Sequence, residues 1–215
     1  MSTLKALTTL LAKPRRLKAL LSYGHKGYLN SIGWFRAFDE QQAIDGNGDP
    51  IPWVTYSFID FIKGRLNKNL VVFEYGSGSS TLFYADHVRR VVSVEHDEEW
   101  YQKIVGSKPA NAEMIYTQLS TDGEYARKAA LLNEKFDIII VDGRDRVNCC
   151  KHSLAALTEK GVIVLDDSER AAYNDARILL KQAGFKELSF SGISPGLFYL
   201  KATSVFYRPD NALSI

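Results

Sequence analysis

A turn that contains two glycines follows a short apolar run and carries the first chemical signal in the sequence. It reads Glu74-Tyr75-Gly76-Ser77-Gly78-Ser79-Ser80. Glycine lets the backbone turn sharply and lets a ligand approach it closely, and a helix that follows presents free N–H groups. Thr81 stands where the third glycine of a dinucleotide fingerprint would fall, and the lysine of a Walker motif is absent. The turn therefore predicts either a nucleotide site or a plain strand-to-helix connection.

A second apolar run ends in an acidic residue, Glu95, which lies 17 residues beyond Gly78. A carboxylate at this place can accept hydrogen bonds from both hydroxyls of a ribose, each worth about 1.5–3 kcal/mol. Asp97 is better suited to cap the next helix, because two further glutamates follow it. His96 lies either near an adenine or in an exposed loop. The turn and Glu95 together indicate an adenosine-bearing ligand.

Three more carboxylates end the later apolar runs. Asp142 follows one run, and Asp166 and Asp167 follow the next. Asp142 could contact an amine of the ligand, act as a base or hold a metal. Adjacent carboxylates repel one another unless they are paired, protonated or bound to a cation. Two interpretations stand: a magnesium or calcium site built from all three aspartates, or Asp166 facing the crevice while Asp167 caps the next helix.

Two arginines and two aromatic residues are candidates for substrate binding. Arg144 and Arg146 follow Asp142 closely, and guanidinium groups suit carboxylates and phosphates. The alternative is an internal ion pair with Asp145. Trp53 and Tyr56 precede the regular part of the chain and either wall a substrate pocket or pack into the core.

Apolar runs alternate with helical patterns from residue 70 onward, and these elements would position the side chains named above. Continuous apolar strands separated by helices predict a doubly wound α/β fold with a mostly parallel sheet of seven strands and helices on both faces. Ligands in such folds bind beyond the carboxyl ends of the strands. We predict strands at 70–75, 90–95, 112–117, 136–142, 161–166, 185–190 and 203–207, and helices at 79–88, 97–105, 122–132, 147–158 and 169–183.

Residues 1–67 are predicted to form a helical and loop-rich extension that serves as a substrate lid, followed by the main domain at 68–215. Leucines at near-helical spacing over 4–22 predict a helix that Pro14 splits or starts. Seven basic residues and no acidic one precede Asp39. Such a leader could contact a membrane surface, a phosphate-bearing substrate or a nucleic acid, and the alternative is a solvated amphipathic helix. We expect a small-molecule substrate and no nucleic-acid partner.

Composition favours a soluble globular protein, with 46% apolar and 24% charged residues. The two cysteines, Cys149 and Cys150, are adjacent, and neighbours in sequence rarely form a disulfide. No apolar run reaches the roughly 18–20 residues that a membrane span requires. These features fit a protein of the reducing cytoplasm.

These residues resemble the class I S-adenosylmethionine-dependent methyltransferases over roughly residues 68–208. The resemblance implies a Rossmann-like methyltransferase sheet. It implies that the glycine turn contacts the amino-acid part of S-adenosylmethionine, that Glu95 holds the ribose, and that the adenine contact falls within 117–123. The cofactor-binding residues implied or inferred are Glu74, Gly76, Ser77, Gly78, Ser80, Glu95, His96 and Asp142.

The ends of the fourth and fifth predicted strands also resemble the metal-dependent catechol-type O-methyltransferases, which bind magnesium through an aspartate and an Asp-Asn pair. Here the pair is Asp166-Asp167 or Asp167-Ser168, and the asparagine is missing. The segment before the core, with Asn47–Trp53, resembles bacterial methyltransferase-like proteins.

The sequence thus predicts a methyltransferase that acts on a small polar or anionic acceptor by O- or N-methylation, with Asp142 as the catalytic residue. The main rival is a non-catalytic S-adenosylmethionine-binding protein whose basic leader contacts a membrane or partner. Aminopropyl transfer on the same fold and a nicotinamide dehydrogenase are weaker alternatives, the latter because the third fingerprint glycine is missing.

Overall fold

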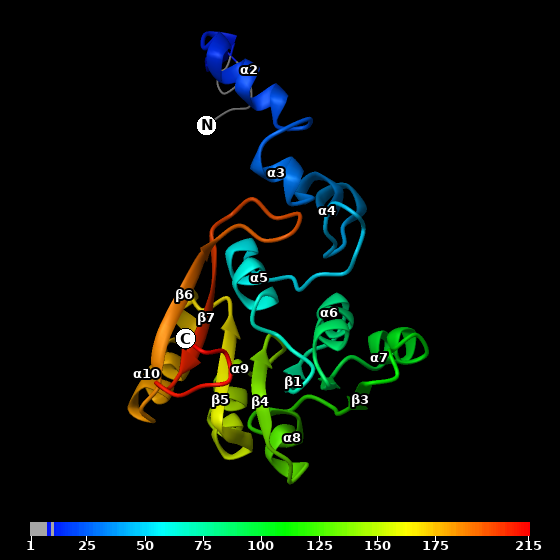
Figure 1. The fold of residues 1–215 in the computed structure, drawn as a ribbon, viewed down its shortest axis with the longest axis vertical. Helices are drawn as coiled ribbons and strands as arrows, with labels where there is room; N and C mark the ends of the chain where they lie inside the picture. The colour runs from blue at the N-terminus through cyan, green and yellow to red at the C-terminus, as the bar shows by residue number, and fades with distance from the viewer. Residues whose placement is uncertain (1–7, 10) are drawn as a thin grey trace.

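The computed structural model describes residues 8–9 and 11–215, and its centre is one sheet of seven strands (Figure 1). The order across the sheet is β3-β2-β1-β4-β5-β7-β6, with β7 antiparallel to both of its neighbours and the other adjacent pairs parallel. This confirms the predicted doubly wound, mostly parallel sheet. The strands are β1 (Val71–Tyr75), β2 (Arg90–Glu95), β3 (Ala112–Tyr116), β4 (Phe136–Val141), β5 (Leu157–Asp166), β6 (Lys186–Gly192) and β7 (Lys201–Tyr207).

The central strands are apolar on both faces because both faces are covered. In β4, Ile138 and Ile140 pack into one core cluster, whereas Ile139 and Val141 pack into the other. This alternation is the two-residue period of a strand. The first cluster also holds side chains of α5 and α6, and the second holds side chains of α8, α9 and α10. The helices are α2 (Pro14–Ser22), α3 (Tyr28–Ser31), α4 (Trp34–Glu40), α5 (Tyr56–Lys63), α6 (Ser79–His87), α7 (Glu98–Val105), α8 (Glu124–Leu131), α9 (Arg146–Ser153) and α10 (Asn174–Gln182).

Three element boundaries differ from the sequence prediction by four residues or more. Helix α9 ends at Ser153 rather than at 158, because a short 3-10 turn over Leu154–Ala156 and then β5 follow it. Strand β5 begins at Leu157 rather than at 161, because Leu157 is buried against β4 before an irregular register brings Val162 opposite Ile138. Helix α10 begins at Asn174 rather than at 169, since a short 3-10 turn over Ala171–Tyr173 precedes it.

The N-terminal part extends from the sheet as a series of short helices, and α2 lies at the far end of the molecule (Figure 1). Pro14 opens α2, as its position predicts, although residues 1–7 and 10 of the predicted leader lie outside the described part. Helix α4 is tied to the connection between β6 and β7, because Trp34 Nε1 donates to the carbonyl of Leu197 at 2.8 Å. Helix α5 buries Phe58 and Ile62 in the core of the sheet.

Gly33 is the tightest point of this N-terminal part and gives a stability prediction. It has φ +78°, and an added Cβ would lie 2.1 Å from the backbone nitrogen of Gly46. Gly33→Ala should therefore lower the free energy of unfolding by about 2 kcal/mol or more, measured by denaturant unfolding. Gly64→Ala is the matched control, since Gly64 has φ −76° and open space around it. Equal stabilities of the two variants would contradict this account.

Candidate functional site

A cavity of about 910 Å³ lies beyond the carboxyl ends of the central strands. Its walls come from the glycine turn after β1, the end of β2, the start of α7, the loop after β4 and the segment Glu40–Ala43 that follows α4. Parallel strands β2, β1 and β4 are neighbours, so the loops that leave them meet at this edge. This is the place where ligands bind in open α/β sheets.

The glycine turn forms the floor of the cavity. Gly76 has φ +96° and Gly78 has φ +155°, which side chains rarely adopt. The N–H of Gly76 donates to the carbonyl of Val94 at 2.9 Å, which fastens the turn to the end of β2. A Cβ on Gly143, in the loop after β4, would lie 3.1 Å from the Gly76 nitrogen and 2.0 Å from the hydroxyl oxygen of Tyr125. Two loops therefore approach each other with backbone alone, which leaves room for a ligand above them.

Glu95 places a fixed carboxylate in the wall of the cavity. Its side chain is only 5% exposed, and it accepts hydrogen bonds from the N–H groups of His96 at 2.7 Å and Asp97 at 2.9 Å. The hydroxyl of Ser77 donates to its other oxygen at 2.7 Å. The structure thus joins the predicted turn and the predicted acid directly, and Asp97 caps α7 as expected by accepting from the N–H of Trp100.

Trp100 is a cavity residue that the sequence reasoning missed. Its Nε1 donates to the carbonyl of Ser77 at 3.0 Å, and its ring lies against Gly78, 3.7 Å from where a Cβ would stand. The ammonium of Lys103 lies 5.2 Å from the ring centroid. In the sequence, Trp100 cannot be told apart from a tryptophan that only packs its helix against the sheet. Only the fold shows that it flanks the glycine turn.

Glu74 lies buried at the end of β1, on the cavity side of the turn. It accepts hydrogen bonds from the hydroxyls of Thr81 at 2.6 Å and Ser93 at 2.9 Å. Burial outweighs these hydrogen bonds and raises the pKa of Glu74 to about 7. Glu74 therefore changes charge near neutral pH and can adapt to a cationic group placed beside it.

The three aspartates predicted as a metal site surround protein cations instead. Lys201, at the start of β7, places its Nζ 2.8 Å from Asp166 Oδ2 and 3.0 Å from Asp167 Oδ1. Arg146 lies 3.0 Å from Asp142 Oδ1 and 3.3 Å from Asp167 Oδ2. Among the residues the structure describes, no group of three metal-ligating side chains is assembled. The metal interpretation is therefore not supported, because side-chain cations already neutralise these carboxylates.

Arg146 and Arg144 differ in their surroundings. Arg146 is buried and donates to the carbonyls of Gly143 and Asp166 as well as to Asp142. These contacts match the internal ion pair that the sequence left open, although with partners other than Asp145, and they argue against a substrate role for Arg146. Arg144 is exposed at the cavity.

The two aromatic candidates also separate. Trp53 is exposed at the cavity wall, and its Nε1 donates to the carbonyl of Pro195 at 2.7 Å. Tyr56 is buried in the core cluster on the α5 side of the sheet, where burial raises the pKa of its hydroxyl. Its packing therefore favours the structural interpretation.

The catalytic candidate Asp142 lies in the cavity wall beside this ion cluster. Burial and then the charge of Asp166 raise its pKa well above the ordinary range, against the opposing effect of Arg146. A carboxylate with a raised pKa accepts a proton more readily near neutral pH.

The segment 117–123, where the adenine contact is expected, forms the loop after β3. Thr117 is buried, and its N–H donates to the carbonyl of Glu95 at 2.8 Å. Its Oγ1 is buried without a hydrogen-bond partner among the described residues. Asp122 is engaged elsewhere, 2.5 Å from Nε2 of His152. The adenine contact stays a prediction.

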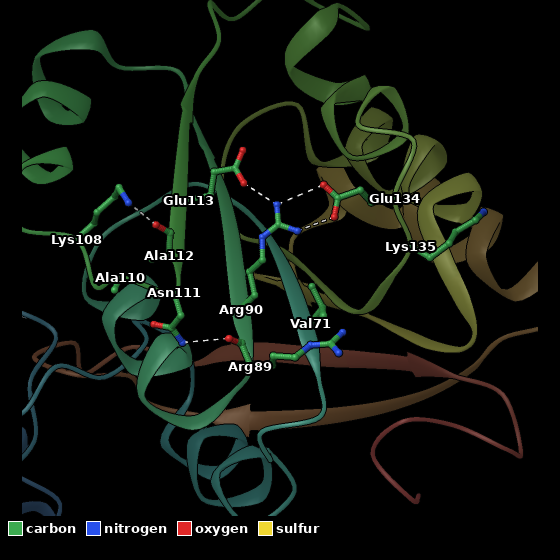
Figure 2. Close-up of a pocket in the computed structure, with 10 residues that line it drawn as sticks. All are labelled: Val71, Arg89, Arg90, Lys108, Ala110, Asn111, Ala112, Glu113, Glu134 and Lys135. Carbon is green, nitrogen blue, oxygen red and sulfur yellow. Dashed lines mark hydrogen bonds and ion pairs between the residues drawn. The ribbon is translucent and has the colours of Figure 1, made fainter.

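A second cavity, of about 580 Å³, lies at the opposite edge of the sheet, where β1, β2 and β3 begin (Figure 2). There Arg90 bridges Glu113 at 2.5 Å and Glu134 at 2.6 Å, and the ammonium groups of Lys108 and Lys135 donate to backbone carbonyls. These contacts join strand ends, whereas the predicted glycine turn, Glu95 and Asp142 all line the larger cavity, so we place the functional site there.

The raised pKa of Glu74 gives a pH-dependent prediction. Below its ordinary pKa of 4.5 both folded and unfolded chains hold the proton, so the group has no effect. Between pH 4.5 and about 7 the unfolded chain has released this proton while the folded chain still holds it, so the folded state loses stability as the pH rises. Above pH 7 the loss is complete, and it amounts to roughly 3 kcal/mol at pH 8. Glu74→Gln should remove this loss, so its free energy of unfolding should exceed that of the wild type increasingly from pH 5 to 8. A difference that does not change with pH would refute the assignment.

Lys201 should be essential for folding stability. Lys201→Met removes the buried cation that pairs with both Asp166 and Asp167 and leaves Arg146 as the other buried cation beside them, so it should destabilise the protein by about 3–5 kcal/mol. The control Lys160→Met removes an exposed ion pair with Asp210 and should change stability by less than about 1 kcal/mol. EDTA should leave the melting temperature of the wild type unchanged. A rise in that temperature with added magnesium would reinstate the metal site.

Comparisons with known proteins bear on the fold. No protein-family profile and no curated protein matches the sequence. Among solved structures, the chain is similar to a precorrin-8w decarboxylase from Methanobacterium thermoautotrophicum, with 17% identity over 71% of this chain and 88% of that one and a TM-score of 0.51. An rRNA methylase from Streptococcus thermophilus gives 16% identity, 69% and 92% coverage and a TM-score of 0.51. The N-methyltransferase NodS from Bradyrhizobium japonicum is 15% identical over 70% of this chain and 91% of that one, with a TM-score of 0.50. With this strand order and this similarity to solved structures, the chain has the class I S-adenosylmethionine-dependent methyltransferase fold.

Proposed function

We propose that this protein is an S-adenosylmethionine-dependent methyltransferase that methylates oxygen or nitrogen of a small polar or anionic acceptor. The observation that carries the proposal is the convergence of the glycine turn and Glu95 on one cavity, linked by the Ser77–Glu95 hydrogen bond of 2.7 Å. The fold supports it, since two of the similar solved structures are described as methylating enzymes.

The cavity residues fit S-adenosylmethionine. A volume of about 910 Å³ is ample for a ligand of this size. Gly76 and Gly78 leave a surface without side chains for the amino-acid part, and Glu74 lies below it to accept from the amine. Glu95 would receive the ribose hydroxyls, with the hydroxyl of Ser77 giving way or sharing the carboxylate. His96 and Trp100 flank this wall and would enclose the adenosine.

The bound cofactor supplies a methyl group on a positively charged sulfur, and the protein must orient an acceptor toward it. Holding two reactants in line can lower a barrier by up to about 7–11 kcal/mol. Asp142 lines the cavity beside the glycine turn, where its backbone N–H donates to the carbonyl of Tyr75 at 3.2 Å, and its raised pKa suits it to take the proton that the acceptor loses. Arg144 at the mouth would attract an anionic part of the acceptor.

Binding of S-adenosylhomocysteine tests the cofactor site without knowledge of the acceptor. Glu95→Gln should weaken binding about 10- to 100-fold in isothermal calorimetry, because the charged acceptor of two hydrogen bonds is lost. Glu99→Gln, which changes an exposed glutamate in the next helix, should bind like the wild type. If Glu95→Gln bound S-adenosylhomocysteine as tightly as the wild type, Glu95 would not be the ribose-binding residue and the proposed cofactor site would be wrong.

Turnover separates an enzyme from a non-catalytic binding protein. Extracts incubated with labelled S-adenosylmethionine should gain label in a small metabolite with the wild type, and Asp142→Asn should abolish most of that transfer while it retains affinity for S-adenosylhomocysteine. Binding without transfer to any extract fraction would favour the non-catalytic alternative.

A further inference from the structure

Helix α2 carries basic charges and an exposed apolar face. Its sequence is Pro-Arg-Arg-Leu-Lys-Ala-Leu-Leu-Ser, and none of its side chains is buried. At helical spacing Leu17, Leu20 and Leu21 share one face, flanked by Arg16 on one side and Lys18 on the other. Leu20 is 48% exposed and Leu21 is 69% exposed. An isolated helix of nine residues is only marginally stable in water. No part of the described chain buries the apolar face of α2 to stabilise it.

A second exposed apolar cluster lies in the connection between β6 and β7. Phe198 is 74% exposed and Leu200 is 71% exposed, although both belong to a well-braced loop. The Trp34 indole donates to the carbonyl of Leu197, and an added Cβ on Gly196 would touch the backbone of Ala37 at 3.0 Å. The loop is therefore held against α4 while its largest apolar side chains point to solvent.

The two features lie at the same end of the molecule, beyond the carboxyl edge of the sheet (Figure 1). The ring of Phe198 lies 6.3 Å from that of Phe38 in α4, which carries the apolar surface toward the N-terminal helices. From residue 11 to residue 38 the chain has six basic residues and no acidic one. This end thus combines positive charge with exposed leucine and aromatic side chains.

We propose that this end of the protein docks on an anionic lipid bilayer, with Leu20, Leu21, Phe198 and Leu200 entering the headgroup region and the basic side chains contacting lipid phosphates. Basic amphipathic helices with aromatic neighbours bind in this way, by apolar burial together with attraction to anionic lipids. Among the described residues no helix is long and apolar enough to span a bilayer, so the contact is peripheral. A nucleic acid would satisfy the basic groups but would leave the leucines and Phe198 against phosphates. The proposal does not rest on the proposed methyl transfer.

Vesicle sedimentation of the full chain tests the docking. The protein should bind vesicles in which roughly a third of the lipid is phosphatidylglycerol and bind vesicles of phosphatidylcholine at least about tenfold more weakly. The charge variant Arg15→Gln, Arg16→Gln, Lys18→Gln should lose at least about tenfold in affinity for the anionic vesicles. The apolar variant Phe198→Ser, Leu200→Ser should lose about fivefold or more, and salt should weaken its remaining binding further.

A matched control removes the same charge elsewhere. Lys63→Gln, Arg89→Gln, Lys186→Gln changes three exposed basic residues outside this end and should bind like the wild type. Because α2 buries no side chain, its variants should keep the wild-type melting temperature, which confirms that lost binding is not lost folding. The proposal is overturned if no vesicle binds, if the control loses as much affinity as the charge variant, or if the apolar variant binds normally. Self-association abolished by Leu20→Ser, Leu21→Ser, or tight binding of RNA without vesicle binding, would equally overturn it.

Discussion

The close approach of the loops after β1 and β4 is the constraint on which the site depends. Gly143 can lie beside Gly76 only because Gly143 has no side chain: an added Cβ would lie 3.1 Å from the Gly76 nitrogen and 2.0 Å from the hydroxyl oxygen of Tyr125. The turn is then fastened to β2 through Val94 and to Glu95 through Ser77. Parallel pairing of β2, β1 and β4 brings all of these groups to one edge, so the cavity is a consequence of strand order and glycine geometry together.

Charge balance is the second constraint at this edge. Asp142, Asp166 and Asp167 lie close together, and like charges in a buried site repel strongly unless they are paired with cations or protonated. Strand β7 enters the sheet antiparallel beside β5 and brings Lys201 to Asp166, while α9 brings Arg146 to Asp142. The cluster holds the end of β5 in place, and its members Asp142, Asp167 and Arg146 line the cavity. Stability and the proposed proton transfer thus draw on the same group of charges.

The N-terminal part contributes to the site and to the outer surface at once. Trp34 and Trp53 each donate to a carbonyl in the connection between β6 and β7, so hydrogen bonds join α4, the segment before α5 and that connection into one unit. The same unit supplies Glu40–Ala43 to the cavity wall and Phe198 to the exposed apolar end. A surface contact at that end would therefore involve the same hydrogen-bonded unit that supplies part of the cavity wall.

By itself the sequence determined the sheet, the glycine turn and Glu95, because these rest on local signals: apolar runs of strand length, glycine where φ is positive, and an acid at a strand end. The sequence also placed Asp142, Asp166 and Asp167 at strand ends, but it left open what neutralises them. Only the tertiary structure decided that Lys201, far along the chain, pairs with Asp166 and Asp167, that Arg146 is internal while Arg144 is exposed, and that Trp100 lies on the glycine turn. Those pairings join elements with no fixed spacing in sequence, so they are set by which strands become neighbours and not by any local pattern of residues.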